Sequence, residues 1–199
     1  RAVRHVVVIS SQQPAAIIAA GDVLGEGPVW DAGRLLWTDI QSRRLRAFDP
    51  ATGAVETFAA PERIGSIALL PDDASRVIAA FETGLGLFDL ASGQVEWLHR
   101  VDAEANGRRF NDGRVDRAGR FWAGTMVEDE AIRHQAQASV WRLDHAGGFT
   151  PHFGGVQIAN GLAFSPDGKT AYFSDSPLQT IFAFDLDEVN AFLVLMVFY

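Results

Sequence analysis

The chain has 199 residues, with 17 Lys and Arg against 25 Asp and Glu, which gives a formal net charge of -8. Hydrophobic residues make up 48% and include 14 Phe and 5 Trp, and side chains that need so much burial exclude a disordered chain. The absence of cysteine excludes a disulfide scaffold, a thiol enzyme and a Cys-ligated metal site. The acidic balance argues against a nucleic-acid partner, and the missing cysteines fit a reducing, cytoplasmic location.

Neither end of the sequence predicts a membrane segment. Residues 1–23 are interpreted as an N-terminal segment that contributes an outer strand; the apolar run Val6–Ile9 inside it is shorter than the roughly 7–15 residues of a signal peptide. The nine apolar residues Ala191–Tyr199 fall far short of the ~20 needed to span a bilayer. We interpret residues 188–199 as an atypical apolar tail, which together with Arg1 suggests a fragment or an abnormal C-terminus.

Between these ends, short apolar strand-like segments alternate with turns at a regular spacing. Asp-containing turns between apolar runs recur 41, 44 and 51 residues apart, at Asp31, Asp72, Asp116 and Asp167. A second marker follows each in the same order, at Asp49, Asp89, Asp144 and Asp185. A period of 40–50 residues with about four strands per unit is typical of a β-propeller.

The repeat predicts an all-β fold of about four blades over residues 24–187. One four-stranded sheet cannot bury its own faces, so neighbouring sheets must stack around an axis. The alternative is two unrelated β-meanders with similar turns. The best helix candidate, residues 128–138, is mostly polar and fits a loop equally well.

Polar residues just before the innermost strand of a blade are the candidates for a site, because these positions converge on the propeller axis. Glu26 lies between two glycines and Asn160 precedes a glycine, each at the entrance of an apolar segment. A carboxylate and an amide oxygen facing one axis suit a hard cation such as Ca²⁺, Mg²⁺ or Mn²⁺. Alternatively, Glu26 caps a turn and Asn160 tolerates left-handed geometry before Gly161.

The segment Arg109–Gly113 offers a second set of candidates. Asn111, Asp112 and Gly113 are either a site or an ordinary turn, because Asn-Asp-Gly is a strong turn signal. Arg109 is either a solvated surface charge or, if it faces the axis, a donor for the hydroxyls or carboxylate of a sugar acid.

Three segments together resemble the senescence-marker-protein, gluconolactonase and luciferin-regenerating-enzyme-like family. They are Gly25–Trp30, Arg109–Met126 and Ala159–Gly168, in family order and spacing within a match from about Leu24 to Asp187. The resemblance implies a β-propeller of the six-bladed type, here apparently truncated to about four blades. It implies one divalent cation (Ca²⁺, Zn²⁺, Mn²⁺ or Mg²⁺) in the axial channel and hydrolysis of sugar lactones.

The resemblance also assigns roles to particular residues. It implies that Glu26 and Asn160 bind the metal, and that Arg109 and Asn111 contact substrate, although Asn111 alternatively reaches the metal or its bound water. Asp129, with Glu128 as its neighbour, is the implied acidic substrate contact. The family's general-base aspartate, also a metal ligand, belongs to a later blade beyond the chain end, and Asp175 looks structural.

Three hypotheses follow for function. The first is a divalent-metal-dependent lactonase acting on a small sugar lactone, inactive if the missing aspartate is required. The second is a non-catalytic propeller that binds a metal or ligand, and the third is a truncated product that does neither.

Overall fold

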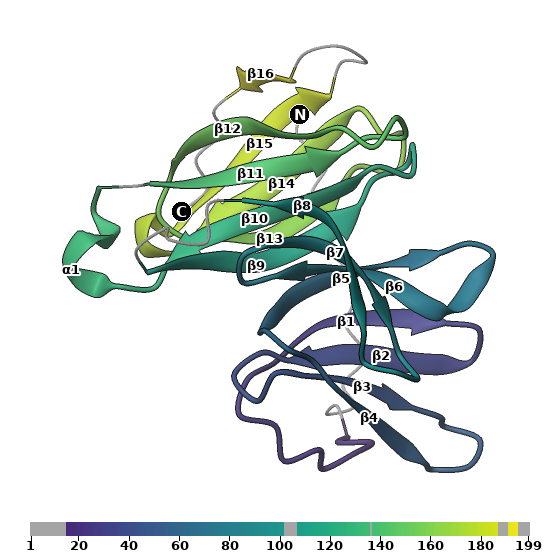
Figure 1. Cartoon of the computed structure of the whole chain (residues 1–199). Coiled ribbons are helices and arrows are strands. Elements are labelled where there is room, and N and C mark those ends of the chain that lie inside the picture. Colours follow the sequence, from purple (N-terminus) through teal and green to yellow (C-terminus); the bar gives the residue numbers. More distant parts are fainter. Residues whose placement is uncertain (1–14, 102–106, 136, 187–190, 195–199) are drawn as a thin grey trace.

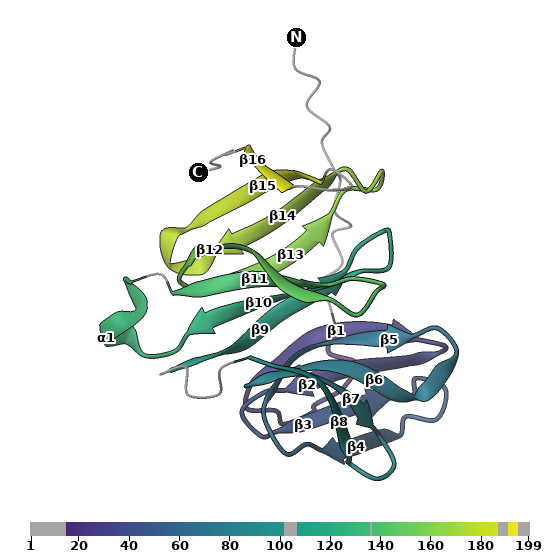
Figure 2. The ribbon, with the colours of Figure 1, turned by 45° about the horizontal axis from the view of Figure 1, so that its top comes forward.

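The computed structural model describes residues 15–101, 107–135, 137–186 and 191–194, the last four by their backbone alone. Within these ranges the chain forms four antiparallel sheets, each built from four consecutive strands. The sheets follow one another in chain order, from purple to yellow in Figure 1, and Figure 2 shows the same succession from another side. The expected all-β fold with four propeller blades is therefore confirmed.

The strands are assigned to blades as follows. Blade 1 contains β1 (Gly25–Asp31), β2 (Arg34–Asp39), β3 (Arg44–Phe48) and β4 (Val55–Ala59). Blade 2 contains β5 (Ile64–Leu70), β6 (Asp73–Phe81), β7 (Gly84–Asp89) and β8 (Val95–Arg100). Blade 3 contains β9 (Arg108–Val115), β10 (Phe121–Val127), β11 (Ala138–Leu143) and β12 (Phe149–Val156). Blade 4 contains β13 (Ala159–Phe164), β14 (Thr170–Asp175), β15 (Thr180–Leu186) and β16 (Ala191–Val194).

The repeated aspartates mark the same two places in every blade. Asp31, Asp72, Asp116 and Asp167 lie at or within the connection from the first to the second strand. The second set lies near the connection from the third to the fourth strand, where Asp49, Asp89 and Asp144 accept hydrogen bonds from backbone N–H groups two or three residues further on. Asx-type hydrogen bonds of this kind favour tight turns, which explains why aspartate recurs there.

In the described part of the chain the core consists of three layers, each between two neighbouring blades. Leu36 and Leu45 of blade 1 pack with Ile64 and Phe81 of blade 2. A second layer joins blades 2 and 3 and includes Phe110, and a third joins blades 3 and 4. Each sheet thus buries its faces against its neighbours, which is the stacking that the repeat predicts. The first strands β1, β5, β9 and β13 also lie against one another in succession, so they line the common centre.

The two segments outside the repeat differ in what the structure describes. Strand β16 pairs with β15 from Ala191 opposite Leu186 to Val194 opposite Ala183, so the apolar tail supplies the fourth strand of blade 4. Residues 188–190 and 195–199 of that tail lie outside the described residues. Residues 15–24 contain no strand, and the outer strand expected within 1–23 stays a prediction because residues 1–14 also lie outside.

The described residues have little helix. Within the described part of the candidate helix 128–138, one turn is helical, α1 (Glu130–Arg133), and a 3-10 turn, η1 (Ser176–Leu178), follows β14. Of the helices among the described residues, none has the length and apolar character required to cross a bilayer.

Candidate functional site

Glu26 and Asn160 occupy equivalent positions at the beginnings of two inner strands. Glu26 of β1 lies opposite Thr38 of β2, and Asn160 of β13 lies opposite Ser174 of β14. In both strands the pairing register shifts directly afterwards, which marks a β-bulge. Bulges re-aim side chains at functional sites, so two oxygen-bearing side chains occur where the regular alternation of the strand is broken.

The glycines after these residues adopt the left-handed backbone conformation. Gly27 has φ 60° and Gly161 has φ 63°, whereas Asn160 is not among the described non-glycine residues with positive φ. The left-handed geometry therefore resides in Gly161, and the interpretation that Asn160 itself adopts it is wrong. Asn160 Oδ1 accepts a hydrogen bond from the Gly161 N–H at 3.0 Å.

Glu26 is exposed, and its carboxylate takes no part in the hydrogen bonds or ion pairs formed among the described residues. Its contact in the fold is through the backbone, where its carbonyl oxygen accepts from Thr38 Oγ1 at 3.3 Å. The alternative of a turn cap therefore finds no support in the described part of the chain. The carboxylate is available for a ligand.

Arg109 and Asn111 lie on β9, and both are held by hydrogen bonds. Arg109 is 4% exposed, so the interpretation as a solvated surface charge is wrong. Its terminal Nη1 donates to the Phe110 carbonyl at 2.9 Å and to Asn111 Oδ1 at 3.1 Å. Asn111 Nδ2 in turn donates to the Ala159 carbonyl at 2.9 Å, which links blade 3 to the beginning of β13 in blade 4. Asn111 is therefore a strand residue and not part of a turn.

Glu128 and Asp129, the two acidic candidates, have different environments. Glu128 follows the last residue of β10 and accepts from Arg109 Nε at 2.8 Å. It also accepts from both terminal nitrogens of Arg63, each at 2.8 Å. Asp129 caps α1, because its side chain accepts from the Ala131 N–H at 2.9 Å. Glu128 is thus engaged by two arginines.

Arg63 and Glu82 are residues that sequence reasoning missed. Arg63 directly precedes β5, and its Nη2 lies 2.5 Å from Glu82 Oε1 just past the end of β6. This pair repeats in blade 2 the Arg109–Glu128 pair of blade 3, and both pairs are separated by 19 residues in the sequence. The equal spacing, read against the blade repeat, is a signal that could have found them.

The negative charges of Glu82 and Glu128 are stabilised by their arginine partners. The hydrogen bond from Arg63 keeps the pKa of Glu82 below its usual range, although burial opposes the shift. Burial acts to raise the pKa of Glu128, but hydrogen bonds from Arg63 and Arg109 outweigh it and the pKa lies below its ordinary value. Both carboxylates are therefore ionised at neutral pH.

Two other carboxylates near the inner strands have structural partners. Asp175 is 1% exposed and accepts from the backbone N–H groups of Gln157 and Ile158, both at 3.0 Å, which agrees with the structural role expected for it. Asp112 accepts from the Leu162 N–H at 2.7 Å and so joins β9 to β13. Burial raises the pKa of Asp112, although that hydrogen bond opposes the shift.

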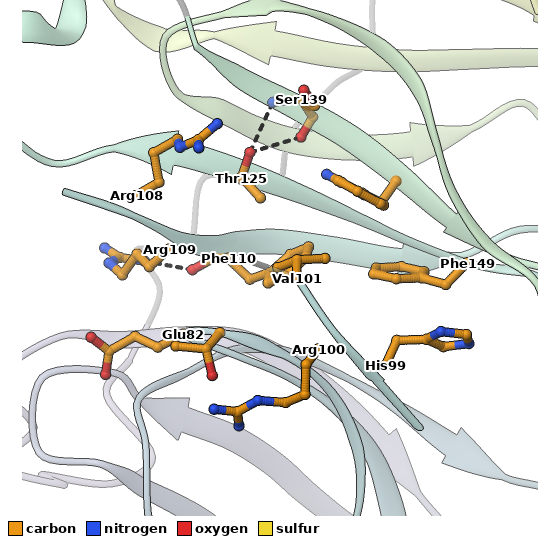
Figure 3. A pocket seen from close by; sticks show the side chains of 12 residues that line it. Glu82, His99, Arg100, Val101, Arg108, Arg109, Phe110, Thr125, Ser139 and Phe149 are labelled. Carbon is orange, nitrogen blue, oxygen red and sulfur yellow. Dashed lines mark hydrogen bonds between the residues drawn. The ribbon is translucent and has the colours of Figure 1, made fainter. Parts of the chain in front are cut away.

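A cavity of about 390 Å³ lies between blades 2 and 3, beside these residues. Figure 3 shows Arg109 at one end of it, next to the Phe110 carbonyl, with Glu82 across from Arg109 and Phe149 further along. Its apolar wall includes Phe110, Trp141 and Phe149, and the Trp141 and Phe149 rings are stacked at 5.1 Å. Among the described residues, Arg109 and Glu82 belong both to the cavity lining and to the ion pairs of the candidate site.

The donor set fits part of a site for a hard cation. Glu26 and Asn160 offer oxygen ligands from equivalent places on two blades, and Ca²⁺ takes 6–8 such ligands, several of which are commonly water. Among the described residues there is no group of three or more His, Cys, Asp or Glu side chains able to hold a metal ion. Glu26 and Asn160 would therefore need additional ligands.

Fold and site together define a β-propeller whose inner strand entrances hold polar side chains. The sequence matches a family model: residues 24–193 match the SMP-30/Gluconolactonase/LRE-like region. The chain belongs to this family, as the three sequence segments predicted.

Individual relatives agree with this membership. The chain is 39% identical over 175 residues to 6-deoxy-6-sulfogluconolactonase of Pseudomonas putida, covering 86% of this chain and 58% of that protein. It is 36% identical over 170 residues to regucalcin of Gallus gallus, covering 82% of this chain and 56% of the relative. Among solved structures, a regucalcin from Agrobacterium tumefaciens, described as a calcium-binding protein, superposes with a TM-score of 0.79 at 30% identity, covering 89% of this chain and 59% of that one. The chain thus spans less than two thirds of the length of these relatives.

Proposed function

We propose that this chain carries the site of a divalent-metal-dependent hydrolase of sugar lactones. The observation that carries the proposal is the equivalence of Glu26 and Asn160, two oxygen donors at matching bulged positions of inner strands. A lactonase name among the similar proteins supports the reaction class, and a relative described as calcium-binding supports the cation. The acidic, cysteine-free composition supports a cytoplasmic location.

Each residue has a distinct proposed role. Glu26 and Asn160 would hold one divalent cation, which when bound supplies positive charge that stabilises an oxyanion on the lactone carbonyl. Arg109 presents a buried, oriented guanidinium to the hydroxyl and carbonyl oxygens of the sugar. Asn111 holds Arg109 and links it to blade 4. Asp129 is proposed as an acidic substrate contact, whereas Glu128 acts through Arg109.

The second candidate is a non-catalytic propeller that binds a metal or a sugar. Three carboxylates near the inner strands, Glu128, Asp175 and Asp112, are each engaged by arginines or backbone N–H groups. All three thus already serve as hydrogen-bond acceptors within the fold, and this observation favours binding without hydrolysis.

The same experiment separates the two candidates. Purified protein is assayed with D-gluconolactone in the presence of Mn²⁺, Zn²⁺ or Ca²⁺, alongside Glu26→Gln. A lactonase gives a metal-dependent rate that Glu26→Gln abolishes. A binding protein gives no rate above the uncatalysed background but has a melting temperature that the cation raises in the wild type alone. If the wild type shows no metal-dependent rate and no cation-dependent rise in melting temperature, both candidates are overturned.

A further inference from the structure

Three ion pairs of blades 2 and 3 form one continuous row across the blade boundary. Glu82 contacts Arg63, Arg63 contacts Glu128, and Glu128 contacts Arg109, with nitrogen–oxygen distances of 2.5, 2.8 and 2.8 Å. Arg109 is the buried end of the row and Arg63 is 18% exposed. The row therefore joins a residue without a sequence-based role, Arg63, to a proposed substrate contact.

Arg63 determines how Glu128 is oriented. Two parallel N–H···O bonds connect the Arg63 guanidinium to the two oxygens of Glu128, an arrangement that fixes the carboxylate plane as well as its position. The oxygen Oε1 held by Arg63 also accepts from Arg109 Nε. The direction of the Arg109 guanidinium thus depends on a carboxylate that a second arginine holds in place.

The charge balance of the row gives Arg63 a second effect. Glu128 alone would neutralise Arg109, and an anion approaching Arg109 would be repelled by Glu128. Arg63 compensates Glu128, while Glu82 compensates Arg63 from the far side. Because opposite charges within a few ångströms interact strongly at partly buried sites, loss of Arg63 leaves an excess negative charge beside Arg109.

We propose that Arg63 is a positioning residue: through Glu128 it orients the Arg109 guanidinium and keeps its positive charge available to a sugar-acid ligand. This inference rests on the proposed function, in which Arg109 contacts substrate. Hydrolysis adds water to a neutral lactone ring and yields an aldonic acid, which ionises to the aldonate by releasing a proton. Arg63 therefore affects binding of the anionic product more than binding of the neutral substrate.

The variants Arg63→Met and Arg63→Lys test the proposal against a matched control. Arg76→Met is the control, since Arg76 also lies in blade 2 and pairs with Asp73 at 2.6 Å near the start of β6, with no contact to the row among the described residues. We expect the Kd for D-gluconate to rise about tenfold in Arg63→Met, the equivalent of one charge-assisted hydrogen bond. The KM for D-gluconolactone should change less, about threefold or below on the same scale.

A second readout does not require activity. The Nε–H resonance of Arg109, assigned by its loss in Arg109→Lys, reports the hydrogen bond to Glu128. In Arg63→Met it should shift or broaden, and in Arg76→Met it should be unchanged. Arg63→Lys keeps the charge but lacks the fork, so it should recover gluconate affinity in part and leave the Arg109 resonance perturbed.

Glu82→Gln should change the affinity for gluconate in the opposite direction to Arg63→Met. It is the second test if Arg63→Met does not fold. It removes a negative charge while the Arg63–Glu128 contact remains, so gluconate should bind at least as tightly as to the wild type. If Arg63→Met and Arg63→Lys bind gluconate like Arg76→Met while the wild type binds it, the positioning role is overturned and the proposed function stands. If the wild type neither binds gluconate nor hydrolyses the lactone, the proposed function fails and takes this inference with it.

Discussion

The close packing of the inner strands leads to a sharp prediction for Gly65→Ala. A Cβ atom built on Gly65 would lie 2.5 Å from the Asn111 carbonyl oxygen and 2.6 Å from the Phe110 carbonyl oxygen. Both contacts are with the backbone of β9, which cannot move aside as the end of a side chain can. Gly65 is not among the glycines with positive φ, so the penalty comes from this contact and not from backbone strain.

We expect Gly65→Ala to lower the free energy of unfolding by about 2 to 3 kcal/mol, the upper part of the range for overpacked cores. For a chain of this size that corresponds to a melting temperature about 5 to 10 °C lower. Thermal and urea unfolding measure the change. Because the contacts are at Phe110 and Asn111, the Nε–H resonance of Arg109 should also shift.

Gly154→Ala is the matched control. It lies in the outer strand β12, also without positive φ, and its nearest neighbour to an added Cβ is the Ser139 hydroxyl at 3.3 Å. It should cost less than about 1 kcal/mol. Equal stability of the two variants would refute the claim that the contact between β5 and β9 leaves no room for a Cβ atom at residue 65.

Three further changes test the packing and the charges. Asp175→Asn removes one of two acceptors for the N–H groups of residues 157–158 and should cost about 2 to 3 kcal/mol in urea unfolding; a loss below about 0.5 kcal/mol would contradict its structural role. Burial opposes ionisation of Asp39, but hydrogen bonds outweigh it and lower its pKa to about 2 from 3.8. Its stabilising effect of about 2 kcal/mol is therefore complete above pH 3.8 and lost as the pH falls toward 2, so Asp39→Asn should flatten the stability profile there, and an unchanged slope would count against the assignment. Phe173→Ala, at a 3% exposed position between blades 3 and 4, should cost about 3 to 5 kcal/mol, and Phe173→Leu should recover most of it.

The blade repeat was predictable because its cause is local. The aspartates that mark it accept hydrogen bonds from nearby backbone N–H groups, so the turn chemistry is written in short sequence segments. The fourth strand of blade 4 was not predictable in the same way. Its residues form an apolar run without alternation, and only its pairing with β15 distinguishes it from a tail.

The candidate site was predictable in part. Glu26, Arg109, Asn111 and Asn160 were identified, and the structure describes where each lies; their roles in binding remain predictions. The cross-blade contact between Arg63 and Glu128 was not foreseen, because it joins residues 65 positions apart and ion pairs of this kind leave no local pattern. The burial of Arg109 likewise depends on tertiary packing.

The limit to prediction at this site has a specific structural cause. In a regular strand, side chains alternate between the two faces, so the position of a residue in the sequence indicates the face to which its side chain points. The pairing register shifts after Glu26 and Asn160, between Ile64 and Ser66, and opposite β9 between Ala123 and Thr125, so all four inner strands are irregular near their entrances. The alternation of side chains between the two faces is interrupted there, close to residues that are proposed to bind metal and substrate. The direction in which Glu26 or Asn111 points therefore follows from how a bulge is packed against the next inner strand. At Gly65 that packing leaves no room for a Cβ atom beside the backbone of β9.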